Sequence, residues 1–261
     1  MDAELRILSS ITKILPRWKV LRIFVNRVVL PFYRRKTRSM FISEVNGINM
    51  ELDPAEFIDA ALLFLPQMYD AEELNTLKTL VKDDWSVVDI GAHIGFYSLT
   101  LANLVSQGSV LAIEAAPSNA LRFQKNVELN PKLKNIKLLI NGVSDKIETL
   151  SMGISTTGNT SGNSFLSGSS TRIDVTCKPL LELIRESAID RIDFMKMDIE
   201  GFEFRVLNHF LQNATPTLFP KWILIEDNPT LVQEGSIHSL LQRHGYKVAR
   251  DFGLNKLYSL A

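Results

Sequence analysis

The sequence predicts an α/β protein built on a mostly parallel sheet that helices cover on both faces. From Val87 onward, short apolar runs alternate with segments of helical periodicity. The runs are apolar along nearly their whole length, as strands buried on both faces of a parallel sheet require. A composition of 46% apolar and 22% charged residues fits a globular protein, and the single cysteine, Cys177, excludes an internal disulfide.

A short hairpin is expected ahead of this core. Phe41, Ser43 and Val45 alternate with polar neighbours, Asn46-Gly47 is a strong hairpin turn, and residues 48–52 return as a strand. A helix is then expected over residues 69–81. Asp70 is its expected N-cap, and two acids, Glu72 and Glu73, follow in its first turn.

The core elements follow in order. Strands are expected at residues 87–90, 110–115, 136–141, 192–198, 222–226, 246–252 and 254–260. Helices are expected up to about residue 104, over 118–130 and 180–186, after 198, and up to about 244. The last two strands are joined by a short turn at Gly253, so they should pair antiparallel. Residues 151–171 are rich in Ser, Thr and Gly and are expected to form an exposed loop, with a mobile lid as the less favoured interpretation.

Residues 1–40 are expected to form a basic amphipathic helical extension. Residues 1–43 hold only two acids, Asp2 and Glu4, whereas the rest of the chain holds 19 basic and 27 acidic residues. The ten basic residues are Arg6, Lys13, Arg17, Lys19, Arg22, Arg27, Arg34, Arg35, Lys36 and Arg38. Packing on the main domain or on a partner chain, such as a second copy, is the plainer use of the extension, and contact with an anionic membrane surface is the alternative.

No run qualifies as membrane-spanning, because Arg22, Arg27 and Pro31 interrupt the most apolar stretch, residues 20–33. The acids that open the chain also argue against a secretory signal. We therefore expect a cytoplasmic protein, with peripheral contact at the inner membrane face left open.

A glycine loop follows the first core strand. In Asp89-Ile90-Gly91-Ala92-His93-Ile94-Gly95, histidine stands where a dinucleotide-binding loop needs its second glycine, and no Walker lysine follows. This argues against a dinucleotide oxidoreductase. The remaining spacing suits a ligand with an amino-acid end and a nucleoside end, because an acid at the strand tip can accept a hydrogen bond from an ammonium group.

The next strand ends on a second acid, Glu114, 25 residues after Asp89. A carboxylate at this position can accept hydrogen bonds from both hydroxyls of a ribose, and open α/β sheets bind ligands at the carboxyl ends of their strands. A surface glutamate without a ligand is the plain alternative.

Four segments together resemble the FkbM-type methyltransferases. They are VVDIGAHIGFYSLTLA, VLAIEAAPSNALRFQKNVELN, LLINGVSD and IDFMKMDIEGFEFRVL, within residues 50–228, and the run from Lys196 to Gly201 with Glu203 is the most distinctive. The resemblance implies the class I Rossmann-like fold, with seven strands of which the last is antiparallel, over a methyltransferase domain at 41–261 whose core starts near residue 75. It also implies S-adenosylmethionine as cofactor and a hydroxyl acceptor on a sugar, a glycolipid or a secondary metabolite.

The resemblance also assigns cofactor-binding residues. It places Asp89, Gly91 and Gly95 at the methionine end of the cofactor and Glu114 at its ribose. Residues expected near the adenine are Asn141, Val143 and Ser144, and Tyr69-Asp70 stands where the family has Tyr-Glu. Two positions depart from the family pattern: Ala115 replaces the usual proline after Glu114, and CKPLLELI replaces a Thr-Leu-Asp segment.

Methyl transfer to a hydroxyl needs a group that accepts the hydroxyl proton. In an extended strand Lys196 and Asp198 point to the same face, and Glu200 follows at the same parity. Asp198 or Glu200 is the candidate base, with Lys196 pairing with it or tuning its pKa. A structural ion-pair cluster is the alternative interpretation. His93 is a further candidate base, although packing is the commoner role for a side chain at its position.

No metal is assigned, but a magnesium-assisted variant would use Asp198, Asp227 and Asn228. A nucleic-acid methyltransferase docking through the basic extension is a competing function that the acidic body opposes. A non-catalytic protein that binds S-adenosylmethionine is the other alternative.

Overall fold

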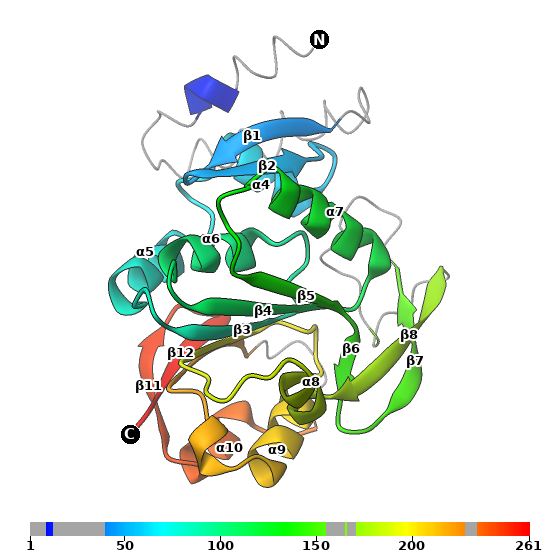
Figure 1. Cartoon of the computed structure of the whole chain (residues 1–261), viewed down its shortest axis with the longest axis vertical. Coiled ribbons are helices and arrows are strands. Elements are labelled where there is room, and N and C mark those ends of the chain that lie inside the picture. Colours follow the sequence, from blue (N-terminus) through cyan, green and yellow to red (C-terminus); the bar gives the residue numbers. More distant parts are fainter. Residues whose placement is uncertain (1–8, 13–39, 155–164, 166–170, 228–233) are drawn as a thin grey trace.

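A computed structural model of the chain describes residues 9–12, 40–154, 165, 171–227 and 234–261. Its centre is a seven-stranded sheet in the order β11-β12-β10-β9-β3-β4-β5 (Figure 1). The strands are β3 (Ser86–Ile90), β4 (Ser109–Glu114), β5 (Ile136–Ile140), β9 (Phe194–Met197), β10 (Trp222–Glu226), β11 (Tyr246–Asp251) and β12 (Asn255–Leu260). β12 pairs antiparallel with both neighbours, and the other pairs in this sheet are parallel. This is the predicted class I methyltransferase arrangement, antiparallel terminal pair included.

Alternate residues of each central strand supply two separate cores. Val87 of β3 packs into the core on one face, and Val88 packs into the core on the other. The same alternation divides β4 at Val110 and Leu111. Because both faces are covered, the strands read as apolar runs rather than as alternating patterns.

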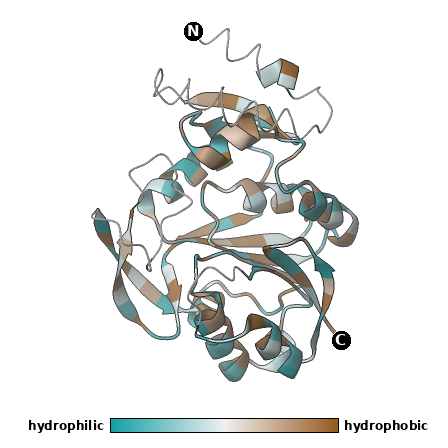
Figure 2. Cartoon of the chain, turned by 180° about the vertical axis from the view of Figure 1, so that it is seen from behind, coloured by the Kyte–Doolittle hydropathy of each residue, from teal (hydrophilic) through white to brown (hydrophobic). Residues whose placement is uncertain are grey.

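Helices cover both faces of the sheet (Figure 1). One face carries α5 (Ala71–Leu80), α6 (Phe96–Leu104) and α7 (Pro117–Glu128). The other carries α8 (Leu180–Glu186), α9 (Glu203–Asn213) and α10 (Ile237–Arg243). A 3-10 turn, η3 (Pro216–Leu218), precedes β10. The hydropathy colouring shows apolar residues in the central strands and polar ones on the outer faces of the helices (Figure 2).

The predicted hairpin is present as β1 (Phe41–Val45) and β2 (Ile48–Leu52). Its turn residues Asn46 and Gly47 both have positive φ, 52° and 86°, as a tight two-residue hairpin turn requires. Asn126 of α7 accepts from the Glu51 amide of β2, and Asn130, just beyond the end of α7, bonds both the amide and the carbonyl of Asn49. The hairpin is therefore part of the main core and not a separate unit.

Helix α4 (Phe57–Phe64), for which the sequence offers no clear signal, follows the hairpin. Its buried Asp59 forms an ion pair with Arg122 of α7. The described residues 9–12 lie against this helix, where the Ser9 hydroxyl donates to the Leu63 carbonyl. The rest of the predicted N-terminal extension, including its ten basic residues, lies outside the described residues. In the described part of the chain, no helix is long and apolar enough to cross a membrane.

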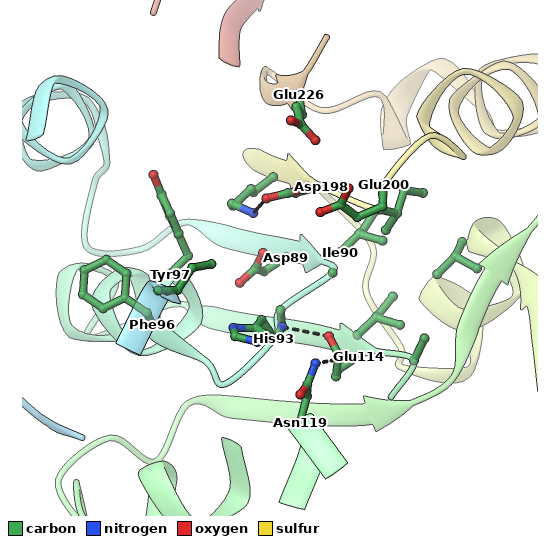
Figure 3. A pocket seen from close by; sticks show the side chains of 18 of the residues that line it. Asp89, Ile90, His93, Phe96, Tyr97, Glu114, Asn119, Asp198, Glu200 and Glu226 are labelled. Atoms are coloured by element: carbon green, nitrogen blue, oxygen red, sulfur yellow. Dashed lines mark hydrogen bonds and ion pairs between the residues drawn. The ribbon is translucent and has the colours of Figure 1, made fainter. Parts of the chain in front are cut away.

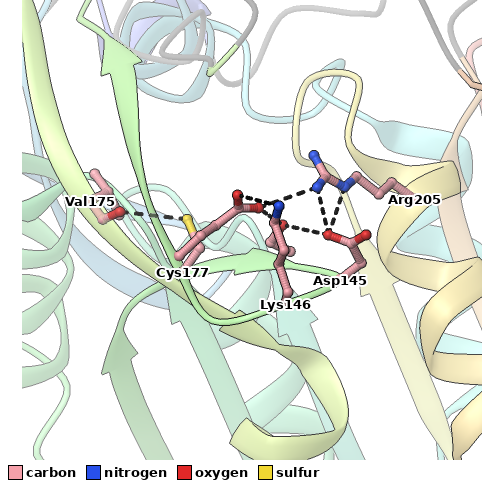
Figure 4. A network of polar contacts seen from close by, with 7 residues as sticks. Asp145, Lys146, Val175, Cys177 and Arg205 are labelled. Atoms are coloured by element: carbon pink, nitrogen blue, oxygen red, sulfur yellow. Dashed lines mark hydrogen bonds and ion pairs between the residues drawn. The ribbon is translucent and has the colours of Figure 1, made fainter.

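A second, three-stranded sheet occupies part of the region predicted as an exposed loop. Its strands are β6 (Gly142–Ser144), β7 (Glu148–Gly153) and β8 (Arg172–Pro179), in the order β6-β8-β7. The loop prediction is therefore wrong for residues 151–153, and Met152 is buried. Arg205 of α9 ties this sheet to the main domain through Asp145 and Glu148 (Figure 4). Most of residues 155–170 lie outside the described part.

Candidate active site

A pocket opens at the carboxyl ends of β3, β4, β9 and β10 (Figure 3). The chain runs from β3 outward to β4 and β5 and later returns to place β9 on the other side of β3. Such a reversal leaves a crevice at the strand ends, where α/β proteins bind ligands. The predicted site residues that line this pocket are Tyr69, Asp89, Gly91, Glu114, Asn141, Val143, Lys196, Asp198 and Glu200.

Two predicted residues, Gly95 and Ser144, do not line the pocket. Gly95 has φ +90°, and a Cβ there would lie 2.3 Å from the Phe123 ring. Ser144 is fully buried, and its hydroxyl donates to Glu148 at 2.6 Å. Gly95 therefore allows close packing against Phe123, and Ser144 forms a hydrogen bond within the protein.

Gly91 is required by contact between two loops of the chain. Its φ is +79°, and a Cβ would lie 1.8 Å from the carbonyl oxygen of Asp198. The loop after β3 and the loop after β9 therefore touch backbone to backbone. This contact by itself excludes a side chain at position 91, and Gly91 also lines the pocket.

Asp89 is a fully buried acid at the tip of β3, facing the pocket. Its Oδ2 accepts from the Ser98 hydroxyl at 2.5 Å, and its Oδ1 has no hydrogen-bond partner within the described part of the chain. Burial raises the pKa of this carboxyl, although Lys196 opposes the shift. A buried acceptor without a partner is costly, so Oδ1 is well suited to accept from a cationic ligand group.

Glu114 is also buried, not a surface residue, and backbone amides fix its carboxylate. Oε2 accepts from the His93 amide at 2.8 Å, and Oε1 accepts from the Ala116 amide at 2.8 Å and from Asn119 at 3.4 Å (Figure 3). Burial raises its pKa, and these bonds oppose the rise. The geometry presents a pre-oriented carboxylate to the pocket.

His93 lies in the glycine loop with φ 52°, and burial lowers the pKa of its imidazole to about 4, with a further contribution from Arg122. A buried imidazole of this pKa stays neutral near pH 7 and accepts a proton only weakly. The structure thus favours the packing interpretation of His93 over the base interpretation.

Lys196 and Asp198 lie on the same face, as predicted, with Nζ and Oδ2 3.3 Å apart. The Lys196 ammonium also lies 4.9 Å from the centre of the Tyr97 ring. Burial disfavours the charge of Lys196, but Asp198 and Asp89 outweigh burial and raise its pKa. Lys196 is therefore a fixed cation beneath the acidic end of the pocket.

Glu200 completes an acidic cluster with Asp198 and Glu226, in which one carboxylate oxygen from each lies within 4.8 Å of the others. Figure 3 shows the three side chains turned toward one another. Burial, together with the charges of Asp198 and Glu203, raises the pKa of Glu200 to about 7. A carboxyl with this pKa can accept a proton near neutral pH.

Of the three residues considered as magnesium ligands, Asp198 lines the pocket. Asp227 instead bonds Lys256 at 2.7 Å, and Asn228 lies outside the described residues. We assign no cation to the acidic cluster, because clustered carboxylates alone do not define a metal site.

Asp70 has a different role from the predicted one. It stands at the N-cap position of α5 with φ 44°, but its side chain makes no capping bond. Instead Oδ2 accepts from the Tyr97 hydroxyl at 2.9 Å. Tyr69, next to it, packs edge-on against Phe96 with ring centres 5.6 Å apart. Tyr69, Phe96 and Tyr97 therefore form an aromatic wall of the pocket, and Asp70 fixes the Tyr97 hydroxyl.

Sequence reasoning missed several lining residues: Tyr97, Asn119, Met152, Phe165, Glu226 and Asn255. Glu226 could have been found, because it ends an apolar strand in the same way as Glu114 does. Met152 and Phe165 had no usable signal, since they lie in a stretch without apolar periodicity.

The pocket fits the cofactor that the resemblance implies. Asp89 Oδ1 is a buried acceptor suited to an ammonium group, and the fixed Glu114 carboxylate is suited to ribose hydroxyls. Val143, Met152 and Phe165 add an apolar side beyond Glu114. These residues together offer the mixed polar and apolar surface that a nucleoside joined to an amino acid requires.

Comparison with known proteins gives concordant matches. A family model described as the methyltransferase FkbM domain matches residues 89–248. "Methyltransferase sdnD" of Sordaria araneosa is 28% identical over 202 residues, which cover 63% of this chain and 74% of that protein. The crystal structure of methyltransferase FkbM from Methylobacillus flagellatus KT aligns with a TM-score of 0.46 at 15% identity, covering 91% of this chain and 60% of that one. M. jannaschii TYW2 in complex with AdoMet aligns with a TM-score of 0.45 at 13% identity, covering 86% and 88%.

Proposed function

The chain belongs to the FkbM family of S-adenosylmethionine-dependent methyltransferases, and from this premise we propose that it methylates a hydroxyl group of a sugar, a glycolipid or a secondary metabolite. The observation that carries the proposal is Glu200, a pocket carboxyl whose pKa is raised to about 7. A hydroxyl acceptor needs such a proton acceptor, because an alcohol is a weak nucleophile while it keeps its proton.

Each residue of the pocket has a distinct task in this proposal. When bound, S-adenosylmethionine supplies a methyl group on a sulfonium, which the acceptor oxygen attacks. Asp89 Oδ1 would accept from the ammonium group and Glu114 from the ribose hydroxyls, which would hold the donor in one orientation. Glu200 would take the hydroxyl proton while the acceptor oxygen bonds the methyl carbon and the sulfur–methyl bond breaks, which leaves S-adenosylhomocysteine. Asp198 is held by Lys196 at 3.3 Å, which leaves Glu200 as the better proton acceptor of the two.

The acidic cluster also argues against a nucleic-acid acceptor. Asp198, Glu200 and Glu226 line the pocket. The ammonium of Lys196 is buried beside them and lies over the Tyr97 ring. Phosphate groups approaching this cluster would meet like charge.

Transfer of isotope-labelled methyl from S-adenosylmethionine tests the proposal directly. The panel should contain neutral glycosides, a glycolipid and hydroxylated polyketides, each matched with its deoxy analogue, together with an RNA oligonucleotide. We expect label on at least one hydroxyl compound and none on its deoxy partner. Label on RNA, or equal label on a deoxy analogue, would contradict hydroxyl methylation.

Glu114→Ala is expected to weaken S-adenosylmethionine binding by about 10- to 100-fold, because about 1.5–3 kcal/mol is lost with hydrogen bonds to a charged acceptor. Isothermal titration calorimetry measures the change. Glu128→Gln, in the exposed end of α7, is the matched control and should keep the wild-type Kd. An unchanged Kd for Glu114→Ala would place the ribose elsewhere.

A further inference from the structure

Glu203 is a fully buried acid that lines no part of the pocket. It is the first residue of α9, directly after the loop that carries Asp198 and Glu200. Its Oε1 accepts from the Ile199 amide at 2.7 Å, and its Oε2 accepts from the Gly201 amide at 2.9 Å. The two bonded amides are those on either side of Glu200.

The backbone between these two amides has an unusual conformation. Glu200 has φ 54° and Gly201 has φ 103°. Positive φ is sparsely populated for a residue with a side chain, so the surrounding structure must hold Glu200 there. The Glu203 carboxylate does so from both sides, because each of its oxygens fixes one flanking amide.

The direction of these bonds separates this role from ordinary helix capping. Capping side chains bond amides of the first helical turn or of the N-cap residue, whereas Glu203 bonds the amides of Ile199 and Gly201, which both precede the N-cap Phe202. On its other side the same loop is fixed by Gly91, whose Cα lies against the Asp198 carbonyl. The loop is therefore held at both of its ends.

We propose that Glu203 is a positioning residue, whose carboxylate clamps the two amides around Glu200 and thereby holds the Glu200 carboxylate in the pocket beside Asp198. The inference rests on the proposed function, in which Glu200 accepts the proton. The residue must be glutamate, because glutamine offers only one acceptor oxygen and aspartate is one methylene shorter.

The negative charge of Glu203 acts on Glu200 in addition to the hydrogen bonds of its carboxylate. It lies close enough to Glu200 to raise the pKa of that carboxyl, after burial and Asp198. The two amide donors oppose the rise in the pKa of Glu203 that burial causes, and so favour its charged form. Removing the charge and loosening the loop should both lower the pKa of Glu200.

The test is a carboxyl 13C NMR titration of the full chain labelled at glutamate, with Glu200 assigned through Glu200→Gln. In the wild type we expect a Glu200 midpoint near pH 7. In Glu203→Gln the midpoint should fall by about one pH unit, toward the ordinary glutamate value of 4.5. Glu182→Gln, which removes the acid in the first turn of α8, is the matched control and should leave the midpoint in place.

Amide hydrogen exchange supplies a second, independent readout. Ile199 and Gly201 should be protected in the wild type and exchange about tenfold faster or more in Glu203→Gln, while the Lys196 amide within β9 stays protected. An unmoved Glu200 midpoint in a folded Glu203→Gln protein would overturn the proposal. If that variant does not fold, Glu203→Asp decides, and unchanged exchange of both amides overturns it.

Failure of the proposed function gives a different result from failure of the clamp. If the wild type binds no S-adenosylmethionine in calorimetry, the methyltransferase assignment falls while the amide protection can still be measured. If the wild type and Glu203→Gln both bind the cofactor but share one Glu200 midpoint, only the role of Glu203 is overturned.

Discussion

Glu200→Gln should lower kcat for methyl transfer by about 10²- to 10⁴-fold, the usual contribution of a positioned general base. The amide has nearly the shape of the carboxyl but cannot accept the acceptor proton. Binding of S-adenosylmethionine should stay within about threefold of wild type, because the Asp89 and Glu114 contacts remain. Steady-state kinetics with the hydroxyl compound found in the panel, together with calorimetry, measure both quantities.

The pH dependence of kcat tests the same role of Glu200. Glu200 must be deprotonated to act, and its pKa is raised to about 7, so wild-type kcat should rise as the pH increases through about 7. This limb should vanish in Glu200→Gln. Glu72→Gln, in the exposed first turn of α5, is the control and should keep both the rate and the limb. A wild-type rate in Glu200→Gln, with the limb intact, would move the base to Asp198 or remove it from the mechanism.

Gly91→Ala should destabilise the protein by roughly 4 kcal/mol, which combines about 1–3 kcal/mol for the positive φ with a similar cost for overpacking. The added methyl would lie 1.8 Å from the Asp198 carbonyl oxygen, and neither backbone can yield without moving the pocket. Binding of S-adenosylmethionine should be lost along with stability. Urea unfolding monitored by circular dichroism gives the free-energy difference.

Gly253→Ala is the control that separates the cost of atomic overlap from the cost of the positive φ. Gly253 has φ +98°, but nothing lies within 4 Å of the position a Cβ would take. Gly253→Ala should therefore cost only about 1–2 kcal/mol. Equal losses in the free energy of unfolding for Gly91→Ala and Gly253→Ala would show that the contact between the loops after β3 and β9 adds nothing to the cost.

The mostly parallel sheet and its antiparallel terminal pair were predictable, because both depend on patterns that the local sequence records. Apolar runs such as residues 222–226 could only be strands buried on both faces, and β10 spans those same residues. Gly253 between two short runs indicated the antiparallel pair β11-β12. The second sheet was missed although Ile173, Val175 and Cys177 alternate with polar residues in β8, because β7 and β8 are short, half-exposed strands that flank a stretch rich in Ser, Thr and Gly.

The candidate site was predictable where a residue occupies a strand tip. Asp89, Glu114 and Asp198 come after apolar runs, so the topology alone brings them to one edge. Sequence could not reveal what each carboxylate contacts. The clamp by Glu203 depends on two backbone amides, and the bond from Tyr97 to Asp70 joins residues 27 positions apart. Gly91 was expected to serve the ligand, yet its close contact is with Asp198.

The position of β12 has a consequence for how the protein is made. β12 is translated after β11, yet it lies between β10 and β11 and pairs with both. Until β12 leaves the ribosome, β10 exposes an unpaired edge and β11 has no neighbour in the sheet. The sheet can therefore close only when β12 is available, and the pairing of both β10 and β11 depends on this last strand.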